Sequence, residues 1–447
     1  MRPTREPATK LAVSDRPLSS LRPNPRNART HRKRQVQQIA DSISAFGFLN
    51  PILVDDAGMV LAGHGRLKAA QKLGLQSVPT IAAVGLTEAQ KRAYVLADNK
   101  LAEKAGWDRS LLVAELGELA VLLPPLELDL TITGFDPPEI DALFADLGPI
   151  KGDPADQVPL VTAEPCTQPG DLWTLGPHRL LCGDARSATD VDRLMGGAVA
   201  RVTFTDPPYN VPIHGNVQGR GRIKHPEFAF ASGEMTVPQY RDFLRQSLIQ
   251  VARVSCNGAI VFVCIDWRHM TELHQVGTEM FTELKNVVVW NKTSPSQGSF
   301  YRSQHELIFV FKVGNAEHRN CFGLGAHGRM RSNVWTYPGA NSFRAGRQDE
   351  LPMHPTIKPV ALVADALRDC SLRGELALDL FIGSGTTLLA AEKIGRVCYG
   401  LEYEPAYVDV SVQRWQAYTN SDAALASDGR TFDEVKAARI DQKVSRP

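Results

Sequence analysis

Long apolar runs are missing from this sequence of 447 residues, since none reaches the roughly 18 residues that a membrane-spanning helix needs. The first residues, with Arg2, Arg5 and Lys10, also lack the apolar core of a secretory signal. The seven cysteines form neither a Cys-x-x-Cys pair nor a Cys/His cluster at metal-ligand spacing. These absences predict a cytoplasmic protein with reduced thiols, no metal site and no membrane partner.

An excess of one charge is also missing, because 50 Lys and Arg balance 49 Asp and Glu and leave a net charge of +1. Three runs are nevertheless locally basic: residues 22–34, 214–225 and 318–331. One such run is as readily a solvated surface. Three in one chain favour a polyanionic partner.

Hydrophobic patterning divides the chain into four segments. Residues 1–110 alternate short strand-like runs with amphipathic helical ones, as in a small α/β domain. Residues 111–169 contain one predicted helix and a proline-punctuated stretch, which indicate a connector and linker. Residues 170–420 form a second domain. Residues 421–447 form a polar tail, expected to be a frayed surface helix or partly disordered.

The second domain alternates predicted strands and helices as in a doubly wound α/β sheet. Strands are expected at residues 179–182, 202–205, 259–264, 287–290, 307–311, 376–381 and 397–401, with helices at 237–254 and 359–372. Such sheets bind ligands beyond the carboxyl ends of their strands. Functional residues are therefore expected at these ends.

A strand, a glycine turn and a helix meet at Phe381-Ile382-Gly383-Ser384-Gly385. Glycines allow the backbone to approach a ligand, and a helix amino end offers free N–H groups. The next predicted strand ends at Glu402, where an acid can bind ribose hydroxyls. The third glycine of the dinucleotide fingerprint is absent, so the motif predicts a nucleoside ligand other than NAD; a plain tight turn is the alternative.

A second motif, Asp206-Pro207-Pro208-Tyr209, follows the predicted strand 202–205 directly. The exocyclic amine of a base is a poor nucleophile because its lone pair is delocalised, so its methylation needs acceptors for the N–H protons. Two prolines form a rigid turn that offers only carbonyl acceptors. The Asp206 carboxylate and the Pro207 carbonyl can then bracket one amine, while Tyr209 can stack on a base turned out of a duplex.

A copy of the same three residues occurs at Asp136-Pro137-Pro138-Glu139. It lacks the aromatic residue, and no strand precedes it. An Asp before a helix with proline at the first helical position explains the copy fully. We therefore assign it a structural role.

With these motifs in order, residues 170–420 resemble the DNA amino-methyltransferases in which Asp-Pro-Pro-Tyr precedes Phe-x-Gly-x-Gly. Further matches lie at Cys182-Gly183-Asp184, Trp290-Asn291-Lys292, Gln304-His305-Glu306, His354-Pro355-Thr356-x-Lys358-Pro359, Gly400-x-Glu402-x-x-Pro405-x-Tyr407 and Arg414. The resemblance implies a Rossmann-like fold, S-adenosylmethionine as cofactor, double-stranded DNA as substrate, direct transfer without a covalent enzyme intermediate, and a homodimer.

The resemblance also implies site residues. Catalysis is expected from Asp206, Pro207, Pro208 and Tyr209, and cofactor binding from Asp184, His354, Thr356, Lys358, Asp379, Phe381, Gly383, Ser384, Gly385, Thr386, Thr387 and Glu402. From the basic runs, DNA contacts are expected at Arg220, Arg222, Lys224, Arg329 and Arg331.

Adenine N6 is the expected target of a site-specific modification methylase, because cytosine-N4 members usually have Ser in place of Asp206. Cytosine-N4 methylation and a regulator with a non-catalytic methylase scaffold remain as alternatives.

Residues 11–110 resemble the ParB/sulfiredoxin-like domain through Asn24-Pro25-Arg26-Asn27, Gly63-His64-Gly65-Arg66 and Ala97-Asp98-Asn99. Gly63, Gly65 and Arg66 are expected to bind a phosphate, either of a nucleotide or of DNA; an arginine capping a surface turn is the alternative. We find no helix–turn–helix or dimerising tail of the partition proteins, and no cysteine before Cys166 as sulfiredoxins need. Only ligand binding therefore carries over.

Overall fold

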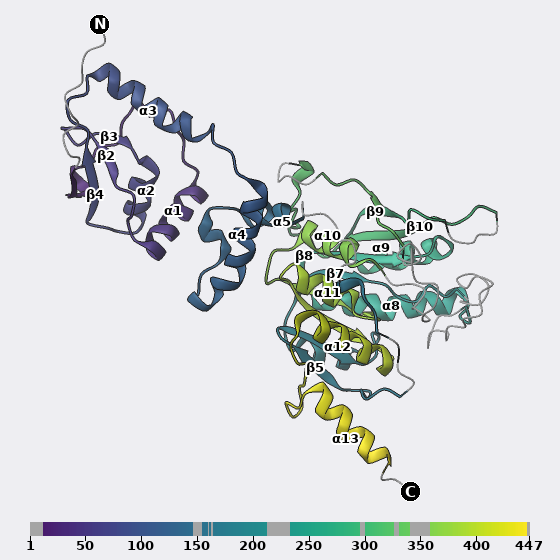
Figure 1. The fold of residues 1–447 in the computed structure, drawn as a ribbon. Coiled ribbons are helices and arrows are strands. Elements are labelled where there is room, and N and C mark those ends of the chain that lie inside the picture. The colour runs from purple at the N-terminus through teal and green to yellow at the C-terminus, as the bar shows by residue number, and fades with distance from the viewer. Residues whose placement is uncertain are drawn as a thin grey trace. The chain divides into compact units, whose positions relative to one another are not determined.

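The computed structural model describes residues 12–145, 154–159, 161, 164–211, 233–295, 300–325, 330–339 and 358–444. The chain forms two compact units, Met1–Phe144 and Ala145–Pro447 (Figure 1). In the described ranges, no helix has both the length and the apolar character that crossing a bilayer requires.

The first unit is built around a four-stranded sheet in the order β1-β4-β2-β3. The strands are β1 (Val13–Pro17), β2 (Ile52–Val54), β3 (Val60–Ala62) and β4 (Ser77–Ala82), and the helices are α1 (Lys33–Phe46), α2 (His64–Lys72) and α3 (Glu88–Ala102). The core combines apolar side chains of the sheet with Leu67 and Ala70 of α2. The sequence pattern predicts strands at residues 51–54 and 59–62 and helices at residues 35–46 and 67–73. They are confirmed as β2, β3, α1 and α2, whereas β1, β4 and α3 add to them.

Two further helices of this unit, α4 (Arg109–Leu122) and α5 (Pro137–Ala145), share a small apolar cluster of their own. Helix α5 begins at Pro137, directly after Asp136, so the second Asp-Pro-Pro copy starts a helix as predicted. The Asp136 carboxylate accepts hydrogen bonds from Gln38 and Arg34 of α1 at 3.0 and 2.8 Å.

The second unit contains a ten-stranded sheet in the order β11-β9-β10-β8-β7-β12-β13-β6-β5-β14. The strands are β5 (Leu172–Leu175), β6 (His178–Cys182), β7 (Ala200–Thr205), β8 (Ser255–Ile265), β9 (Glu283–Asn291), β10 (His305–Lys312), β11 (Val334–Thr336), β12 (Leu376–Asp379), β13 (Val397–Glu402) and β14 (Ala424–Leu425). The central strands β8, β7, β12, β13 and β6 are parallel neighbours.

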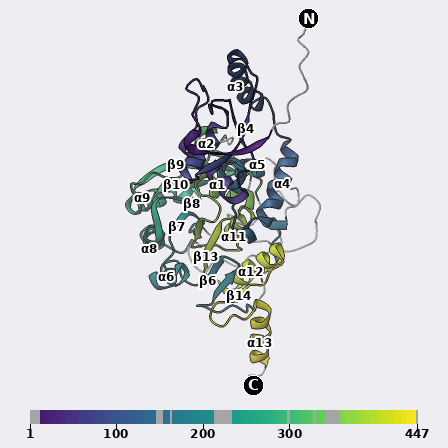
Figure 2. The ribbon, with the colours of Figure 1, turned by 90° about the vertical axis from the view of Figure 1, so that its left-hand side faces the viewer.

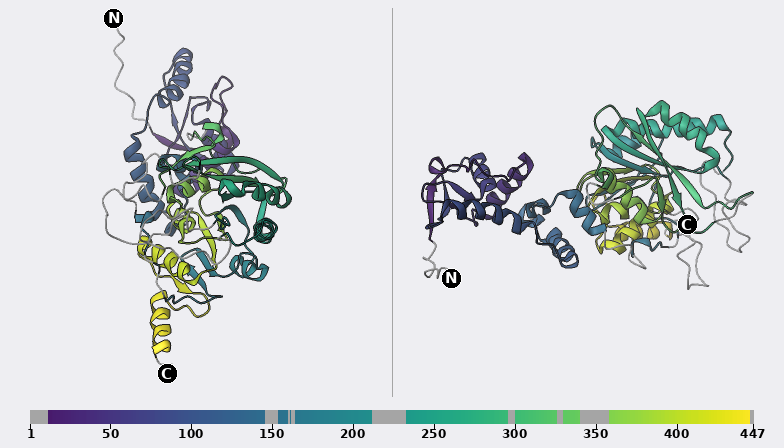
Figure 3. Two further views of the ribbon diagram at one scale, coloured as in Figure 1. Left: turned by 90° about the vertical axis from the view of Figure 1, so that its right-hand side faces the viewer. Right: turned by 90° about the horizontal axis from the view of Figure 1, so that it is seen from above.

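Helices cover both faces of this sheet (Figure 3). One apolar cluster joins the sheet to α6 (Ala188–Met195), α8 (Val237–Val254) and α9 (Met270–Met280). The other joins it to α10 (Val360–Cys370), α11 (Thr386–Lys393) and α12 (Pro405–Thr419). This doubly wound arrangement confirms the predicted Rossmann-like fold.

The end of the chain differs from the expected polar tail. A helix does form, α13 (Phe432–Val444), after β14 (Figure 2). However, β14 pairs with the edge strand β5, and Phe432 is buried against Trp173 with ring centroids 5.2 Å apart. Arg439 also forms an ion pair with Asp171. One aromatic residue in a polar stretch thus fixes the helix to the sheet, so "frayed" was wrong for its first turn.

Candidate active site

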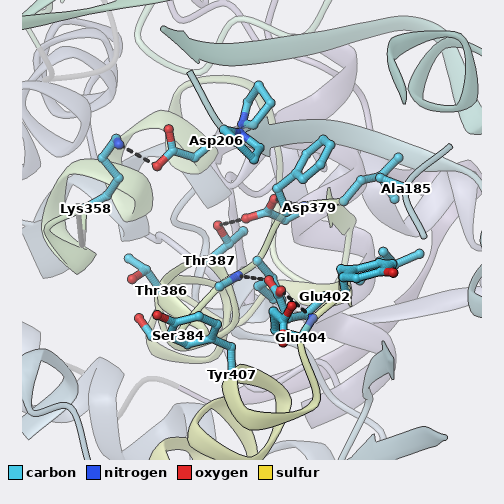
Figure 4. A pocket seen from close by; sticks show the side chains of 18 of the residues that line it. Ala185, Asp206, Lys358, Asp379, Ser384, Thr386, Thr387, Glu402, Glu404 and Tyr407 are labelled. Atoms are coloured by element: carbon cyan, nitrogen blue, oxygen red, sulfur yellow. Dashed lines mark hydrogen bonds and ion pairs between the residues drawn. The ribbon is translucent and has the colours of Figure 1, made fainter. Parts of the chain in front are cut away.

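Three acidic residues stand at the carboxyl ends of three neighbouring parallel strands. Asp206 follows β7, Asp379 ends β12 and Glu402 ends β13. Because parallel strands end at one edge of a sheet, the three carboxylates line a single cavity of about 320 Å³ (Figure 4). Each acid ends, or directly follows, a largely buried strand run, which places it at this edge of the sheet.

The Asp206 carboxylate is held by two side chains. Its Oδ2 accepts a hydrogen bond from Lys358 Nζ at 2.5 Å, and its Oδ1 accepts one from the Tyr209 hydroxyl at 2.5 Å. The fully buried Tyr240 donates to the Pro208 carbonyl at 2.9 Å. No described residue donates to the Pro207 carbonyl, which leaves that acceptor available to a ligand.

Lys358, predicted as a cofactor contact, lines the cavity and also makes contacts within this cluster. Its ammonium lies 3.0 Å from the Tyr209 hydroxyl and 3.1 Å from Glu306 Oε2, and it is almost fully buried. Lys292 forms a second ion pair with Glu306. Neither Glu306 nor Lys292 was among the predicted site residues; their motifs, which resemble elements flanking a base pocket, were the available signal.

Charge coupling sets the protonation of the cluster. Burial alone would raise the pKa of Glu306, but Lys358 and Lys292 outweigh it and lower the pKa to about 2. Burial also raises the pKa of Asp206. The positive charge of Lys358 opposes this rise, and the negative charge of Glu306 adds to it. Burial would lower the pKa of Lys358, yet Asp206 and Glu306 together raise it. The lysine therefore stays charged between the two acids.

The glycine turn after β12 serves two purposes. Gly383 has a φ of +54°, and a Cβ there would meet nothing within 4 Å, so the backbone is open toward the cavity that it lines. Gly385 has a φ of +84°, and its Cβ would lie 2.9 Å from Ser411 Oγ of α12. Gly385 is therefore required for helix packing, and it is not among the residues that line the cavity, so its predicted contact with the cofactor stays a prediction.

The other predicted residues of the turn do line the cavity. They are Phe381, Ser384, Thr386 and Thr387. Arg414, which is buried, donates to the Ser384 carbonyl at 2.5 Å and to Ser384 Oγ at 3.1 Å. These bonds fix the turn from behind.

Asp379 and Glu402 are acids with raised pKa values. Burial raises the pKa of Asp379 to about 7, against hydrogen bonds from Thr387, the Phe381 backbone and Thr205. Burial also raises the pKa of Glu402 to about 7. Its carboxylate accepts the backbone N–H groups of Gly383 and Glu404, each at 2.9 Å. Glu402 thus fastens the glycine turn while facing the cavity.

Asp184 also lines the cavity. Its Oδ1 accepts a hydrogen bond from Arg186 Nε at 2.9 Å, and its Oδ2 accepts one from Arg186 Nη2 at 2.7 Å. Burial raises the pKa of Asp184, but Arg186 outweighs it, and the net shift is downward. Residues that the sequence did not single out, among them Val161, Phe243 and Tyr403, complete the lining.

Of the residues predicted to contact DNA, the structure describes only Arg331. Arg220, Arg222, Lys224 and Arg329, and also His354 and Thr356, lie outside the described residues. Arg331 pairs with Asp369 at 3.0 Å and lies over the Trp335 ring at 4.5 Å. Its charge is therefore paired within the fold, and the expected phosphate contact stays a prediction.

The first unit has a smaller cavity of about 190 Å³ around the predicted phosphate residues. Gly63, with a φ of +99°, caps α2, and the Arg66 guanidinium packs over it. Arg66 Nη1 donates to the Asn50 carbonyl at 2.7 Å. Burial lowers the pKa of Arg66, and Asp98 opposes this shift. Gly65 lies so close to α1 that a Cβ would approach Ile39 to 2.9 Å.

No group of three or more His, Cys, Asp or Glu side chains that could hold a metal ion occurs in the described part of the chain.

Three family models match the chain. A ParB N-terminal domain matches residues 4–100, a ParB-methyltransferase HTH domain matches residues 110–169, and a DNA methylase of the N6/N4 type matches residues 200–413. The second match overturns our expectation that residues 111–169 hold no helix–turn–helix. Helix α5 and all but the first residue of α4 lie in the matched region, but its short, proline-broken elements gave no clear helix–turn–helix pattern.

Individual proteins match in parts. The ParB-like nuclease domain-containing protein YnaK of Escherichia coli is 49% identical over 83 residues, 19% of this chain and 95% of YnaK. The type II methyltransferase M.HinfI of Haemophilus influenzae is 24% identical over 229 residues, 47% of this chain, and the chain spans only 61% of M.HinfI. The crystal structure of the M1.HpyAVI-SAM complex is 17% identical, with a TM-score of 0.38, and the match covers 53% of this chain and 98% of that one.

Proposed function

We propose that this chain, which matches the N6/N4-type DNA methylases over residues 200–413 and the ParB N-terminal domain over residues 4–100, transfers a methyl group from S-adenosylmethionine to the N6 amine of adenine in duplex DNA. One observation carries the proposal: the acceptor pair of Asp206 and Pro207 and the nucleoside-type acid Glu402 line the same cavity. A methyl donor and a base amine can therefore meet in one closed space.

The cavity suits this cofactor. Its wall offers open backbone at Gly383, a carboxylate at Glu402 able to accept from two ribose hydroxyls, and the rings of Phe243 and Phe381 for an aromatic group. When bound, S-adenosylmethionine supplies a methyl group on a positively charged sulfur.

The residues of the catalytic turn would prepare the base. Asp206 and the Pro207 carbonyl would each accept a hydrogen bond from one N–H of the amine. These two bonds would concentrate the lone pair on nitrogen. As the new N–C bond forms, the S–C bond breaks with its electron pair moving to sulfur, and one N–H proton passes to Asp206. Burial raises the pKa of Asp206, which makes its carboxylate a better proton acceptor.

Lys358 and Glu306 would control this acid. The ammonium binds Asp206 Oδ2, keeps the carboxylate ionised before reaction and fixes its orientation. Glu306 in turn holds Lys358 in place from the other side. Since neither group is released to solvent, the cluster is preorganised for the amine.

Adenine is chosen over cytosine because Asp206 stands where cytosine-N4 members usually have Ser. The deciding experiment is incubation with methyl-labelled S-adenosylmethionine and unmethylated plasmid duplex DNA, followed by digestion to nucleosides. We expect labelled N6-methyldeoxyadenosine. Labelled N4-methyldeoxycytidine would replace adenine by cytosine as the target, and the absence of any labelled nucleoside would leave the non-catalytic scaffold as the better account.

For the first unit we propose nucleotide binding. The cavity of about 190 Å³ is compact, and the backbone of Gly63 and the guanidinium of Arg66 line one side of it. A compact phosphate fits this arrangement better than an extended DNA backbone does.

Calorimetry of the full chain with the four ribonucleoside triphosphates tests this. Binding of one of them should be lost in Arg66→Ala and kept in Arg92→Ala, which removes an exposed arginine of α3. If instead Arg66→Ala raises the KM for DNA about tenfold, a loss of about 1.4 kcal/mol, the cavity serves as an additional DNA contact.

A further inference from the structure

The loop between β9 and β10 begins and ends at the catalytic cluster. The Lys292 N–H donates to the Gln304 carbonyl at 2.9 Å, and Gln304 Nε2 donates to Asn291 Oδ1 at 3.0 Å, so the neck of the loop is closed. Directly beyond the neck, Glu306 lies 3.2 Å from the Tyr209 hydroxyl. Whatever this loop touches is therefore adjacent to the base pocket.

Two neighbouring aromatic side chains of this loop are almost uncovered. Phe300 is 86% exposed and Tyr301 is 82% exposed, and their rings meet edge to face with centroids 4.6 Å apart. By contrast, Trp290 at the start of the same connection is 2% exposed. A contiguous apolar surface that the fold leaves in water marks an interaction site.

The chemistry of the loop suits nucleic acid better than protein. From Asn291 to His305 the sequence contains Lys292 and Arg302 but no Asp or Glu, and five of its residues are Ser or Thr. Such a segment can approach phosphates without repulsion. Aromatic rings bind bases of any sequence by stacking, since every base has a π-face.

This inference rests on the proposed function: the geometry points to a second DNA contact of the enzyme. We propose that Phe300 and Tyr301 enter the duplex at the target pair and that one of the rings stacks in the space left by the base that moves into the pocket. Removing a base from the stack exposes the faces of its neighbours, and an apolar wedge can cover them. Tyr301 precedes Glu306 by five residues, so the chain spans at most about 17 Å between them.

The test is the double variant Phe300→Ser/Tyr301→Ser in the full chain, with duplex plasmid DNA as substrate. We expect the KM for this DNA to rise about tenfold, equivalent to about 1.4 kcal/mol, with the affinity for S-adenosylmethionine unchanged. The matched control is Val199→Ser/Ile249→Ser, which removes two apolar side chains that are 58% and 48% exposed. Val199 precedes the amino end of β7, the end away from Asp206. Equal KM values for the two double variants would overturn the proposal.

A second measurement does not depend on methyl transfer. Duplex DNA that carries 5-iododeoxyuridine in place of thymidine is irradiated with the wild-type protein, and cross-linked peptides are identified by mass spectrometry. A cross-link at Phe300 or Tyr301 supports the proposal. Cross-links confined to other segments overturn it and leave the aromatic pair for a protein partner. A wild-type protein that cross-links at the pair but methylates no DNA refutes the proposed function alone.

Discussion

Asp136-Pro137-Pro138 and Asp206-Pro207-Pro208 are the same three residues in two structural settings. The first copy precedes a helix, where Pro137 occupies a position whose N–H would have no partner anyway. The second follows strand β7 in the middle of a parallel sheet, where Asp379 and Glu402 end the two next strands. The comparison teaches that the tripeptide supplies rigidity, while the element before it decides what the aspartate faces.

The partners of the two aspartates differ accordingly. The Asp136 side chain is 32% exposed and meets Arg34, itself 64% exposed. The Asp206 side chain is 22% exposed and meets Lys358, which is 4% exposed. A charge pair in water contributes little, whereas a buried one fixes protonation and orientation. Substitutions at five positions test this contrast, and the expected effects decrease from the first position to the last.

The largest effect is expected for Asp206→Ala. Methyl transfer to DNA should fall by more than about 1,000-fold, because the variant loses a charged acceptor that acts mainly in the transition state. The affinity for S-adenosylmethionine, measured by calorimetry, should stay within a few-fold. Transfer that survives within tenfold of wild type would remove Asp206 from the mechanism.

Lys358→Met comes next, with an expected loss of about 100-fold in kcat at pH 7 by analogy with the removal of one preorganised donor. Without the ammonium of Lys358, Asp206 loses its cation while the charged Glu306, still paired with Lys292, remains, so the pKa of Asp206 should rise further and the acid should be protonated at neutral pH. The activity should therefore recover in part as the pH is raised. Lys358→Arg, which keeps the charge, should retain more activity.

The affinity for S-adenosylmethionine decides between the two roles of Lys358. If Lys358→Met weakens cofactor binding and leaves kcat intact, the role that the sequence suggested is correct and the one inferred from the contacts is not.

The same residue shows how far sequence could reach. Asp206, the Gly383 turn and Glu402 were predictable because each follows an apolar strand run directly, which is a local signal. The cluster of Lys358, Glu306 and Asp206 was not, since Lys358 and Asp206 are separated by 152 positions and only the fold brings them together. No local pattern encodes such a pairing.

Two other features were hidden from the sequence for the same reason. Arg331 lies in a basic run, and the sequence does not show that Asp369, from the distant helix α10, pairs with it. Phe432 reads as one apolar residue in a polar tail, but Trp173 buries it. The doubly wound order of the second unit, by contrast, was predictable because alternating periodicity along the chain determines it.

Tyr209 is the position at which the two motifs differ, since Glu139 stands there in the first copy. Tyr209→Ala should lower kcat/KM for DNA about 30-fold, because a stacked base on an aromatic ring is worth about 2 kcal/mol. Tyr209→Phe should lower it only about threefold, since the ring remains and only the hydroxyl contacts are lost. Equal losses in the two variants would mean that the hydroxyl, not the ring, carries the effect.

Glu402 ends a strand of the sheet that carries Asp206, an acidic neighbour that Asp136 lacks. A substitution of Glu402 therefore tests the second difference between the two settings. Burial raises the pKa of Glu402 to about 7, and only the ionised carboxylate accepts from two hydroxyls. The Kd for S-adenosylmethionine should thus be about tenfold higher at pH 6 than at pH 8, as one-proton linkage requires. In Glu402→Gln this pH dependence should disappear. A slope that persists in Glu402→Gln would belong to Asp379, whose pKa burial also raises to about 7.

The sign of the linkage is opposite for stability without cofactor. A carboxyl whose pKa is higher in the folded than in the unfolded chain binds its proton more tightly when folded. The stabilisation is complete below about pH 4.5, the usual value for Glu, and is lost as the pH rises through about 7. Thermal unfolding of the unliganded protein should therefore occur at a lower temperature at pH 8 than at pH 6, and Glu402→Gln should reduce this difference.

Asp136→Ala completes the comparison with the smallest effect. Methyl transfer should change by less than about twofold, a difference within the spread of surface substitutions. The cost should fall on the first unit, because the variant loses the residue that precedes α5 and its bonds to Gln38 and Arg34. A helix-capping position and an exposed ion pair together contribute about 1 kcal/mol. Hydrogen exchange of the full chain should show faster exchange in peptides that cover α5, with the peptides of β7 and β12 unchanged. If Asp136→Ala instead abolished transfer while exchange stayed the same, the tripeptide would be functional in both settings, and the strand before Asp206 would not be what gives that motif its chemistry.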